Sequence, residues 1–330
     1  MRRTAIVTAS LAVVLLLLVA VDLLVGSATL SLSQVWSALV GSSDSELSTI
    51  IVRGFRVPKT ITAILTGIAL SVSGLLMQTT FKNPLAGPYV LGISSGASLG
   101  AAIFLLAGGI VVASTPISLA AAAWLGAMAM LIIILAASMR LRSNGSLLIL
   151  GVMLGAAASS GVSILQYVSD EHTLKNFIIW SMGSMANVTG ESLAILAGGV
   201  AGGTLLAFLC VRPLNVLLLG QEQAAVLGVS MRQARTLIFL STSLLAGFST
   251  AFCGPIGFIG IAVPHVARFL YRTSRHGMLL VGCLLIGPIS LVLADTVSQL
   301  PGLPMALPIN AVTSLLGLPI VIYILIRGNR

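Results

Sequence analysis

The stretch Gly220-Gln-Glu-Gln-Ala-Ala-Val-Leu-Gly-Val-Ser230 is a short polar island between two long apolar runs, at about 192–211 and 236–253. These runs approach the roughly 20 apolar residues that a helix needs to cross a bilayer. The island itself predicts a short amphipathic helix, turned by Gly220 and capped at its end by Gly228. A membrane protein has little reason to keep so compact a helix in a loop unless something docks there. We therefore expect a soluble partner to bind this loop.

The whole chain, like these two runs, is strongly apolar. The chain has 330 residues, of which 57% are hydrophobic and only 8% charged, and its mean hydropathy is +1.11. Soluble domains carry about 25% charged residues. No alternating strand pattern appears, so helices rather than a β-barrel satisfy the backbone in lipid. We predict an all-α, polytopic transmembrane helical bundle, with residues 1–330 forming one transmembrane domain.

Apolar runs separated by short polar breaks predict about ten membrane spans, which lie at about 6–25, 60–80, 91–106, 117–139, 146–168, 192–211, 236–253, 263–271, 278–294 and 308–326. The first run is long for a signal peptide and lacks a clear Ala-x-Ala cleavage site, which favours an uncleaved helix with Asp22 near its outer end. Three glycines and two prolines crowd the stretch from Gly254 to Pro264. This composition predicts a sharp re-entrant turn at about 253–268.

The basic residues predict the orientation of the bundle. With the N-terminus inside, thirteen of the 17 basic residues face the cytoplasm, and the four outside are Arg53, Arg56, Lys59 and Lys175. Such an excess on one side is the positive-inside pattern. It favours an even number of spans with both termini in the cytoplasm. It also explains the net charge of +9 without a nucleic-acid partner.

Few residues in the chain point to chemistry. No Gly-x-x-x-x-Gly-Lys-Ser/Thr loop occurs, so we expect ATP to be hydrolysed by a separate subunit. Ser94 lies in Gly92-Ile-Ser-Ser-Gly96, which formally matches a serine-hydrolase elbow, but small residues that open a membrane helix more often cap and pack. An intramembrane serine hydrolase is thus a remote alternative. The histidines and cysteines lack metal-ligand spacing, and we predict no metal and no cofactor.

Acidic residues are nearly absent from the predicted spans. Asp22 and Asp295 both lie near predicted outer ends. An ion-coupled carrier usually keeps buried acids at mid-membrane, and many carriers have inverted halves, of which the sequence gives no sign. A secondary transporter that needs no ATPase is therefore the main alternative to a transporter driven by a partner.

The stretch Gly254-Pro-Ile-Gly-Phe-Ile-Gly260, with Val263-Pro-His265 and Arg268, resembles the signature of the FecCD-type permeases. These are the membrane subunits of binding-protein-dependent ABC importers for iron-siderophores, haem and cobalamin. Further matches cover nearly the whole chain in order: Arg56-Val-Pro58-Lys59, Gly74, Gln78, Asn83-Pro84-Leu85-Ala86, Leu91-Gly92, Ser95-Gly96-Ala97, the 220–228 loop, Ala294-Asp295, Leu316-Gly317 and Pro319.

The resemblance implies an assembly in a bacterial inner membrane, surrounded by lipid. Two copies of a ten-helix subunit form a homodimer with the pathway at the twofold interface. Two ABC ATPase subunits bind the cytoplasmic side, and an extracytoplasmic substrate-binding protein docks outside. The coupling loop would span about 212–235, and its motor-contacting residues would be Gly220, Gln221, Glu222, Ala225, Leu227 and Gly228.

The resemblance also assigns roles to polar residues elsewhere in the chain. Docking of the binding protein would use Arg53, Arg56 and Lys59. The cytoplasmic gate would use Asn83, Leu85, Ser143 and Asn144. The pathway would be lined by Ser159, Ser160, Ser163, Gln166, Asn310, Thr313 and Ser314.

Two positions depart from the family pattern. Gln299 stands where relatives often have Arg, and the chain reads Ala306-Leu307-Pro308 where relatives often have Glu before a Leu-Pro. The first departure removes an expected docking charge. The second weakens any transfer of substrate preference, which we order as iron-siderophore, haem and cobalamin. The expected mechanism is alternating access, in which closure of the ATPase moves the coupling loop.

Overall fold

The structure is a computed structural model that describes residues 2–26, 28, 30–42, 45–107, 115–141, 143–299 and 306–328. These residues form helices and connecting turns, without a strand. The helices are α1 (Arg2–Leu24), α2 (Leu32–Val40), α3 (Glu46–Thr49), η1 (Ile50–Arg56), α4 (Val57–Phe81), η2 (Pro88–Leu91), α5 (Ile93–Ala102), η3 (Ile103–Ala107), α6 (Pro116–Ser138), α7 (Asn144–Val168), α8 (Glu171–Ser181), α9 (Gly190–Leu209), α10 (Val211–Leu217), α11 (Gln221–Val226), α12 (Met231–Cys253), α13 (Ile259–Tyr271), α14 (His276–Ser298) and α15 (Ile309–Gly328).

The ten predicted spans all coincide with apolar helices. Within the described ranges, 7 helical segments are long and apolar enough to cross a membrane: Arg3–Leu24, Glu46–Phe81, Ile117–Ser138, Asn144–Val168, Gly190–Leu209, Met231–Cys253 and His276–Ser298. Three shorter apolar helices, Ile93–Ala107, Ile259–Tyr271 and Ile309–Ile322, match the remaining three spans. The predicted all-α transmembrane bundle is therefore confirmed.

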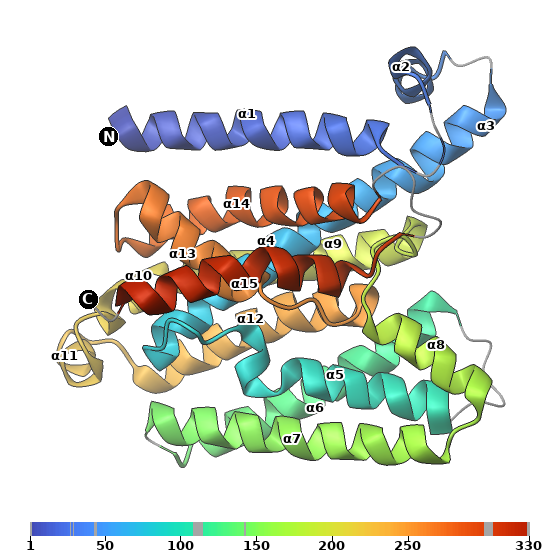
Figure 1. Cartoon of the computed structure of the whole chain (residues 1–330). Helices are drawn as coiled ribbons and strands as arrows, with labels where there is room; N and C mark the ends of the chain where they lie inside the picture. The colour runs from blue at the N-terminus through green and yellow to red at the C-terminus, as the bar shows by residue number, and fades with distance from the viewer. Residues whose placement is uncertain are drawn as a thin grey trace.

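Helix α4 is the buried centre of the bundle, and it packs against α9, α12, α13 and α14 (Figure 1). Glycines set its closest approaches. A Cβ at Gly67 would meet the backbone of Gly287 in α14 at 2.6 Å, and one at Gly74 would collide with the carbonyl oxygen of Gly260 in α13. Because small residues let helix backbones come close together, they drive packing where lipid removes the hydrophobic contribution.

The chain begins and ends at the same end of the bundle. In Figure 1, α1 starts and α15 finishes at the end of the bundle that also holds α10 and α11, whereas α2 and α8 lie at the opposite end. We call these the α11 end and the α8 end. This arrangement agrees with the even number of passes that the charge pattern predicts.

Two segments differ from the sequence prediction. The polar stretch 42–59 between the first two predicted spans is helical from Glu46 onward and continuous with α4. Ser45 caps the start of this helix by accepting a hydrogen bond from the Ser48 backbone N–H. The predicted turn at 253–268 is confined to residues 254–258, since α13 already begins at Ile259 and carries Pro264 inside it. Proline and glycine near a helix start had suggested a longer turn.

Candidate functional site

The short helix α11 and the residues that follow it form an exposed tip at one end of the bundle. Gly220 and Gly228 flank it with φ of +119° and +77°, conformations that glycine adopts without strain. The last helical hydrogen bond lies just after Val226, where the N–H of Leu227 donates to the Gln223 carbonyl at 3.0 Å. The side chains of Val226 and Leu227 are 88% and 55% exposed. The side chains of Gln221, Glu222 and Ala225 lie outside the described part of the structure.

The predicted gate residues belong to the turn after α4 and to the start of α7. After Phe81 the chain turns through Lys82, and the Asn83 side-chain oxygen accepts a hydrogen bond from the Leu85 backbone N–H at 2.9 Å. Ser143 caps α7. Asn144, the next residue, donates from its amide nitrogen to the Thr80 carbonyl at 2.5 Å. The start of α7 is thus joined to the last turn of α4, and the action of these residues as a gate stays a prediction.

An open pocket of about 490 Å³ lies between α5, α7, α8, α15 and the 254–258 turn. Its lining contains hydroxyls, amides and apolar groups and no charged side chain: Tyr89, Ser94, Ser95, Ser98, Ser159, Val162, Ser163, Gln166, Phe177, Ser181, Pro255, Gly257 and Asn310. Four of the predicted pathway residues are among them, namely Ser159, Ser163, Gln166 and Asn310. The Asn310 side-chain oxygen also accepts a hydrogen bond from the Gly257 N–H at 3.0 Å, which ties α15 to the turn.

The other predicted pathway residues do not line this pocket. The Ser160 hydroxyl donates to the Ala156 carbonyl at 3.0 Å on an exposed face of α7. Thr313 and Ser314 both donate to the Asn310 carbonyl, at 3.1 and 2.6 Å. Hydroxyls inside helices often bond back to the preceding turn in this way, so residue type alone does not tell which of them face a cavity.

The sequence analysis missed the contribution of α5 to the pocket. Ser94 and Ser98 are four residues apart and therefore share a helix face. That spacing is the signal in the sequence for a shared polar face, and neither residue was among those predicted to line the pathway. The Ser94 hydroxyl pairs with that of Thr250 at 3.0 Å, and a second hydroxyl is not the base that a serine nucleophile needs.

A cluster of charged side chains is buried at the α8 end, between α1, α4 and α14. Asp22, expected near the interface, is only 3% exposed and accepts hydrogen bonds from Thr60 at 2.6 Å and Thr296 at 2.9 Å. Lys59 forms an ion pair with Asp295 at 3.0 Å. A second bond to Asp295 comes from the amide of Gln299, at 2.8 Å.

The predicted docking residues differ in their surroundings. Arg56 is 8% exposed, and its guanidinium donates to the carbonyls of Leu23, Leu24 and Ala28 at 2.6, 3.0 and 2.5 Å. It therefore satisfies the last carbonyls of α1. Arg53 is exposed and donates to the Leu39 carbonyl at 2.9 Å. Of the three, Arg53 is best placed to meet a partner.

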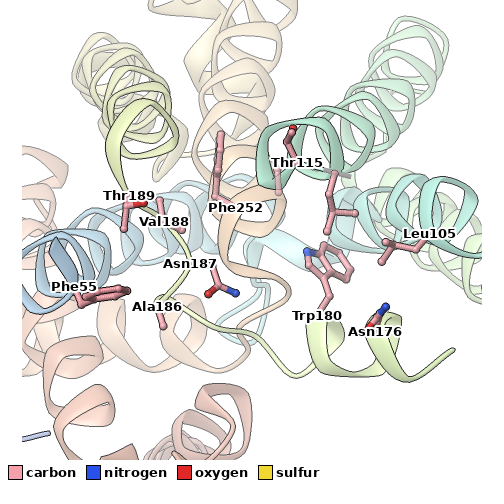
Figure 2. Close-up of a pocket in the computed structure, with 12 residues that line it drawn as sticks. Phe55, Leu105, Thr115, Asn176, Trp180, Ala186, Asn187, Val188, Thr189 and Phe252 are labelled. Carbon is pink, nitrogen blue, oxygen red and sulfur yellow. The ribbon is translucent and has the colours of Figure 1, made fainter. Parts of the chain in front are cut away.

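A second pocket, of about 450 Å³, opens beside α8 (Figure 2). Phe55, Trp180 and Phe252 contribute aromatic rings to it, and Asn176 and Asn187 contribute amides. None of the residues predicted to act in transport lines it. Within the described ranges, no group of three His, Cys, Asp or Glu residues has a geometry that could hold a metal ion.

Comparison with known proteins identifies relatives of the whole chain. The model of the FecCD transport family matches residues 14–327. The hemin transport system permease protein HmuU of Yersinia pestis is 35% identical over 322 residues, which cover 96% of this chain and 95% of the relative. The vitamin B12 import system permease protein BtuC of Salmonella typhi is 36% identical over 277 residues, covering 83% of each chain.

Solved structures share the fold. An inward-facing conformation of a metal-chelate type ABC transporter has a TM-score of 0.85 and 27% identity, with 98% of this chain and 99% of that chain covered. PsaBC from Streptococcus pneumoniae, in complex with a Fab, has a TM-score of 0.57 at 14% identity and covers 88% of this chain and 94% of that chain. The latter likeness concerns the fold alone.

These relatives are transport permeases rather than enzymes, and the matched residues include the α11 tip, the predicted gate residues and the lining of the polar pocket. The chain is a multi-pass membrane protein that belongs to the FecCD transport family.

Proposed function

We propose that this chain is the permease subunit of an ABC importer in a bacterial inner membrane, and that it carries an iron-siderophore or, failing that, haem or cobalamin. The observation that carries the proposal is the α11 tip. Two glycines with positive φ hold a six-residue helix at one end of the bundle, and Val226 and Leu227 expose apolar side chains there. An exposed apolar surface on a polar loop is typical of a docking site.

The partner at this tip is an ATPase subunit. The sequence carries no phosphate-binding loop of its own, so any ATP that drives transport is hydrolysed by another chain. Two copies of the permease would pair, two ATPases would bind their α11 tips in the cytoplasm, and a substrate-binding protein would dock at the α8 end. Closure of the ATPases would move α11 and exchange outward and inward access by hinge and shear motions.

The polar pocket suits a bulky chelate whose charge is largely masked. Its hydroxyl and amide lining offers hydrogen bonds without a fixed charge. Such a lining orients a ligand without holding it by an ion pair, which helps a substrate to leave as well as to enter. The relatives named for hemin and vitamin B12 transport carry large ring chelates.

Replacing Gly228 with leucine tests the proposal. A side chain at φ +77° costs roughly 1–2 kcal/mol in the left-handed region, and it would distort the turn after α11 rather than the bundle, since an added Cβ meets no atom within 4 Å. We expect ATP-driven uptake in proteoliposomes and co-purification of the ATPase both to be lost, while the thermal unfolding of the permease stays unchanged.

The matched control is Gly202→Leu in α9, where an added Cβ also meets no atom within 4 Å but φ is not positive. This variant should transport normally. Full uptake and full ATPase recovery with Gly228→Leu would remove α11 from the proposed role.

A further inference from the structure

Three consecutive residues in the last turn of α4 each bond to a different part of the bundle. The Gln78 amide donates to the Ile261 carbonyl at 3.0 Å, and its oxygen accepts from Arg268 at 2.6 Å, both in α13. The Thr79 hydroxyl lies 2.8 Å from Nε2 of His276 in α14. The Thr80 carbonyl accepts from Asn144 in α7. The end of α4 is therefore a junction of four helices.

The contact between Thr79 and His276 extends to α10, the helix that precedes α11. The side-chain oxygen of Asn215, in α10, accepts the backbone N–H of His276 at 2.9 Å and lies 2.9 Å from Nδ1 of the same ring. Because that oxygen only accepts, Nδ1 must carry a proton. The imidazole, which is 1% exposed, thus bridges α10 to Thr79.

The contact between Thr80 and Asn144 extends to α12, the helix that follows α11. Arg235 lies in the second turn of α12 and is 8% exposed. Its guanidinium donates to the Asn144 side-chain oxygen at 2.8 Å and to the Leu141 carbonyl at 3.2 Å. The amide nitrogen of Asn144 donates in turn to the Thr80 carbonyl at 2.5 Å, so Asn144 links Arg235 to α4.

The two bridges flank α11 in the chain and converge on adjacent residues of α4. Buried hydrogen bonds are costly to leave unmade, and one with a charged donor especially so. A displacement of α10 and α12 should therefore carry Thr79 and Thr80 with it rather than stretch the bridges. The loop that begins at Lys82 follows directly, and His265 of α13 contacts the Pro84 carbonyl in it at 2.8 Å.

We propose that Arg235 and His276 are positioning residues that transmit the position of α11 to the end of α4 and to the loop with Asn83 and Leu85. The inference rests on the proposed function, since it assumes that an ATPase moves α11. It assigns the transmission to two separate polar bridges, one on each side of α11.

The test uses the permease assembled with its ATPase and binding protein in proteoliposomes. Uptake of a radiolabelled ferric siderophore, haemin or cyanocobalamin is measured together with ATP hydrolysis. Arg235→Ala and His276→Phe should each lower the amount taken up per ATP by about 10-fold, the loss expected for a buried charge-assisted or network hydrogen bond. ATP hydrolysis and the yield of the complex should change little.

A third variant separates transmission from stability. Asn144→Asp keeps an acceptor for Arg235 but removes the amide donor to Thr80, so it breaks the bridge at one bond. It should lower uptake per ATP as Arg235→Ala does, without lowering the unfolding temperature. Arg235→Lys keeps the positive charge and can still donate to Asn144, but it lacks the forked guanidinium, so its uptake per ATP should lie between those of Arg235→Ala and the unmodified protein.

Double variants test the two bridges directly. Arg235→Ala combined with Asn144→Ala should lose no more than either alone, because both interrupt one bridge. Arg235→Ala combined with His276→Phe should lose more than either, because they interrupt both. The matched controls are Arg140→Ala, an exposed arginine at the α11 end, and His172→Phe, an exposed histidine on α8.

Unchanged uptake per ATP in Arg235→Ala, His276→Phe and Asn144→Asp would overturn the inference while leaving the proposed function intact. A parallel fall of uptake, hydrolysis and complex yield would also overturn it, because a merely structural role gives that result. If the unmodified complex takes up none of the three probes on ATP, the proposed function fails and the inference fails with it.

Discussion

At the residue scale, Lys59 shows that a basic residue predicted to contact a partner can instead form an ion pair inside the subunit. Topology and family resemblance both favour it as a surface contact for a binding protein. In the structure its ammonium pairs with Asp295 at 3.0 Å, in a cluster that also buries Asp22. The pair lets a carboxylate exist inside the bundle, since a buried charge without a partner is strongly unfavourable.

Replacing Lys59 with methionine should therefore act on stability. The change leaves Asp295 buried and uncompensated, and we expect it to lower the free energy of unfolding by about 3–5 kcal/mol. Unfolding of the purified permease in detergent measures the loss. The double variant Lys59→Met with Asp295→Leu should recover much of it, because the carboxylate is removed as well. A full-stability Lys59→Met protein would contradict the assignment of the pair.

At the scale of elements, the packing of α4 against α13 depends on Gly74. A Cβ there would collide with the Gly260 carbonyl oxygen, which is a backbone atom and cannot rotate away. Gly260 belongs to the glycine- and proline-rich stretch that carries the family resemblance. The close approach explains why this part of the sequence is rich in small residues.

Gly74→Val should separate the two helices. Overpacking of this kind costs about 1–3 kcal/mol where side chains can adjust, and against the backbone we expect the upper end of that range or more. Thermal unfolding of the detergent-solubilised permease measures the effect, with Gly202→Val as the control at an open position of α9. Equal melting temperatures for the two variants would show that α4 and α13 do not pack this closely.

At the scale of the molecule, the two ends of the bundle present different surfaces. The α11 end carries the exposed tip and the bond between Asn144 and the last turn of α4. The α8 end carries exposed Arg53, while Arg56 and Lys59 are engaged inside the subunit. We therefore propose that the docking of the binding protein depends mainly on Arg53.

Arg53→Glu should weaken capture of the binding protein, and the difference from the unmodified protein should shrink as salt rises. Charge complementarity guides association and orientation, and exposed charges are screened within a Debye length of about 8 Å at physiological ionic strength. Binding measured at low and high salt tests this, with Arg140→Glu at the opposite end as the control. The same affinity for both variants at low salt would exclude Arg53 from the contact.

The sequence by itself determined the class, the ten apolar helices, the short helix between Gly220 and Gly228 and the family. These features depend on local composition and spacing: apolar length, glycine at turns, and motifs in a fixed order. Such features can be recognised in the sequence without knowing which segments contact each other in the fold. They also singled out Asn83, in the turn after α4, and Asn144, which the structure bonds to the last turn of α4.

Only the tertiary structure decided the partners of the polar side chains. Arg235 and Asn144 are 91 residues apart, His276 and Thr79 are 197 apart, and Lys59 meets Asp295 across two helices. In a membrane-embedded bundle, a buried donor or charge must find its partner within the protein, and that partner is fixed by how the helices pack. A residue's type and its side of the membrane therefore predicted where charge lies, and the packing of the bundle decided what each charge binds.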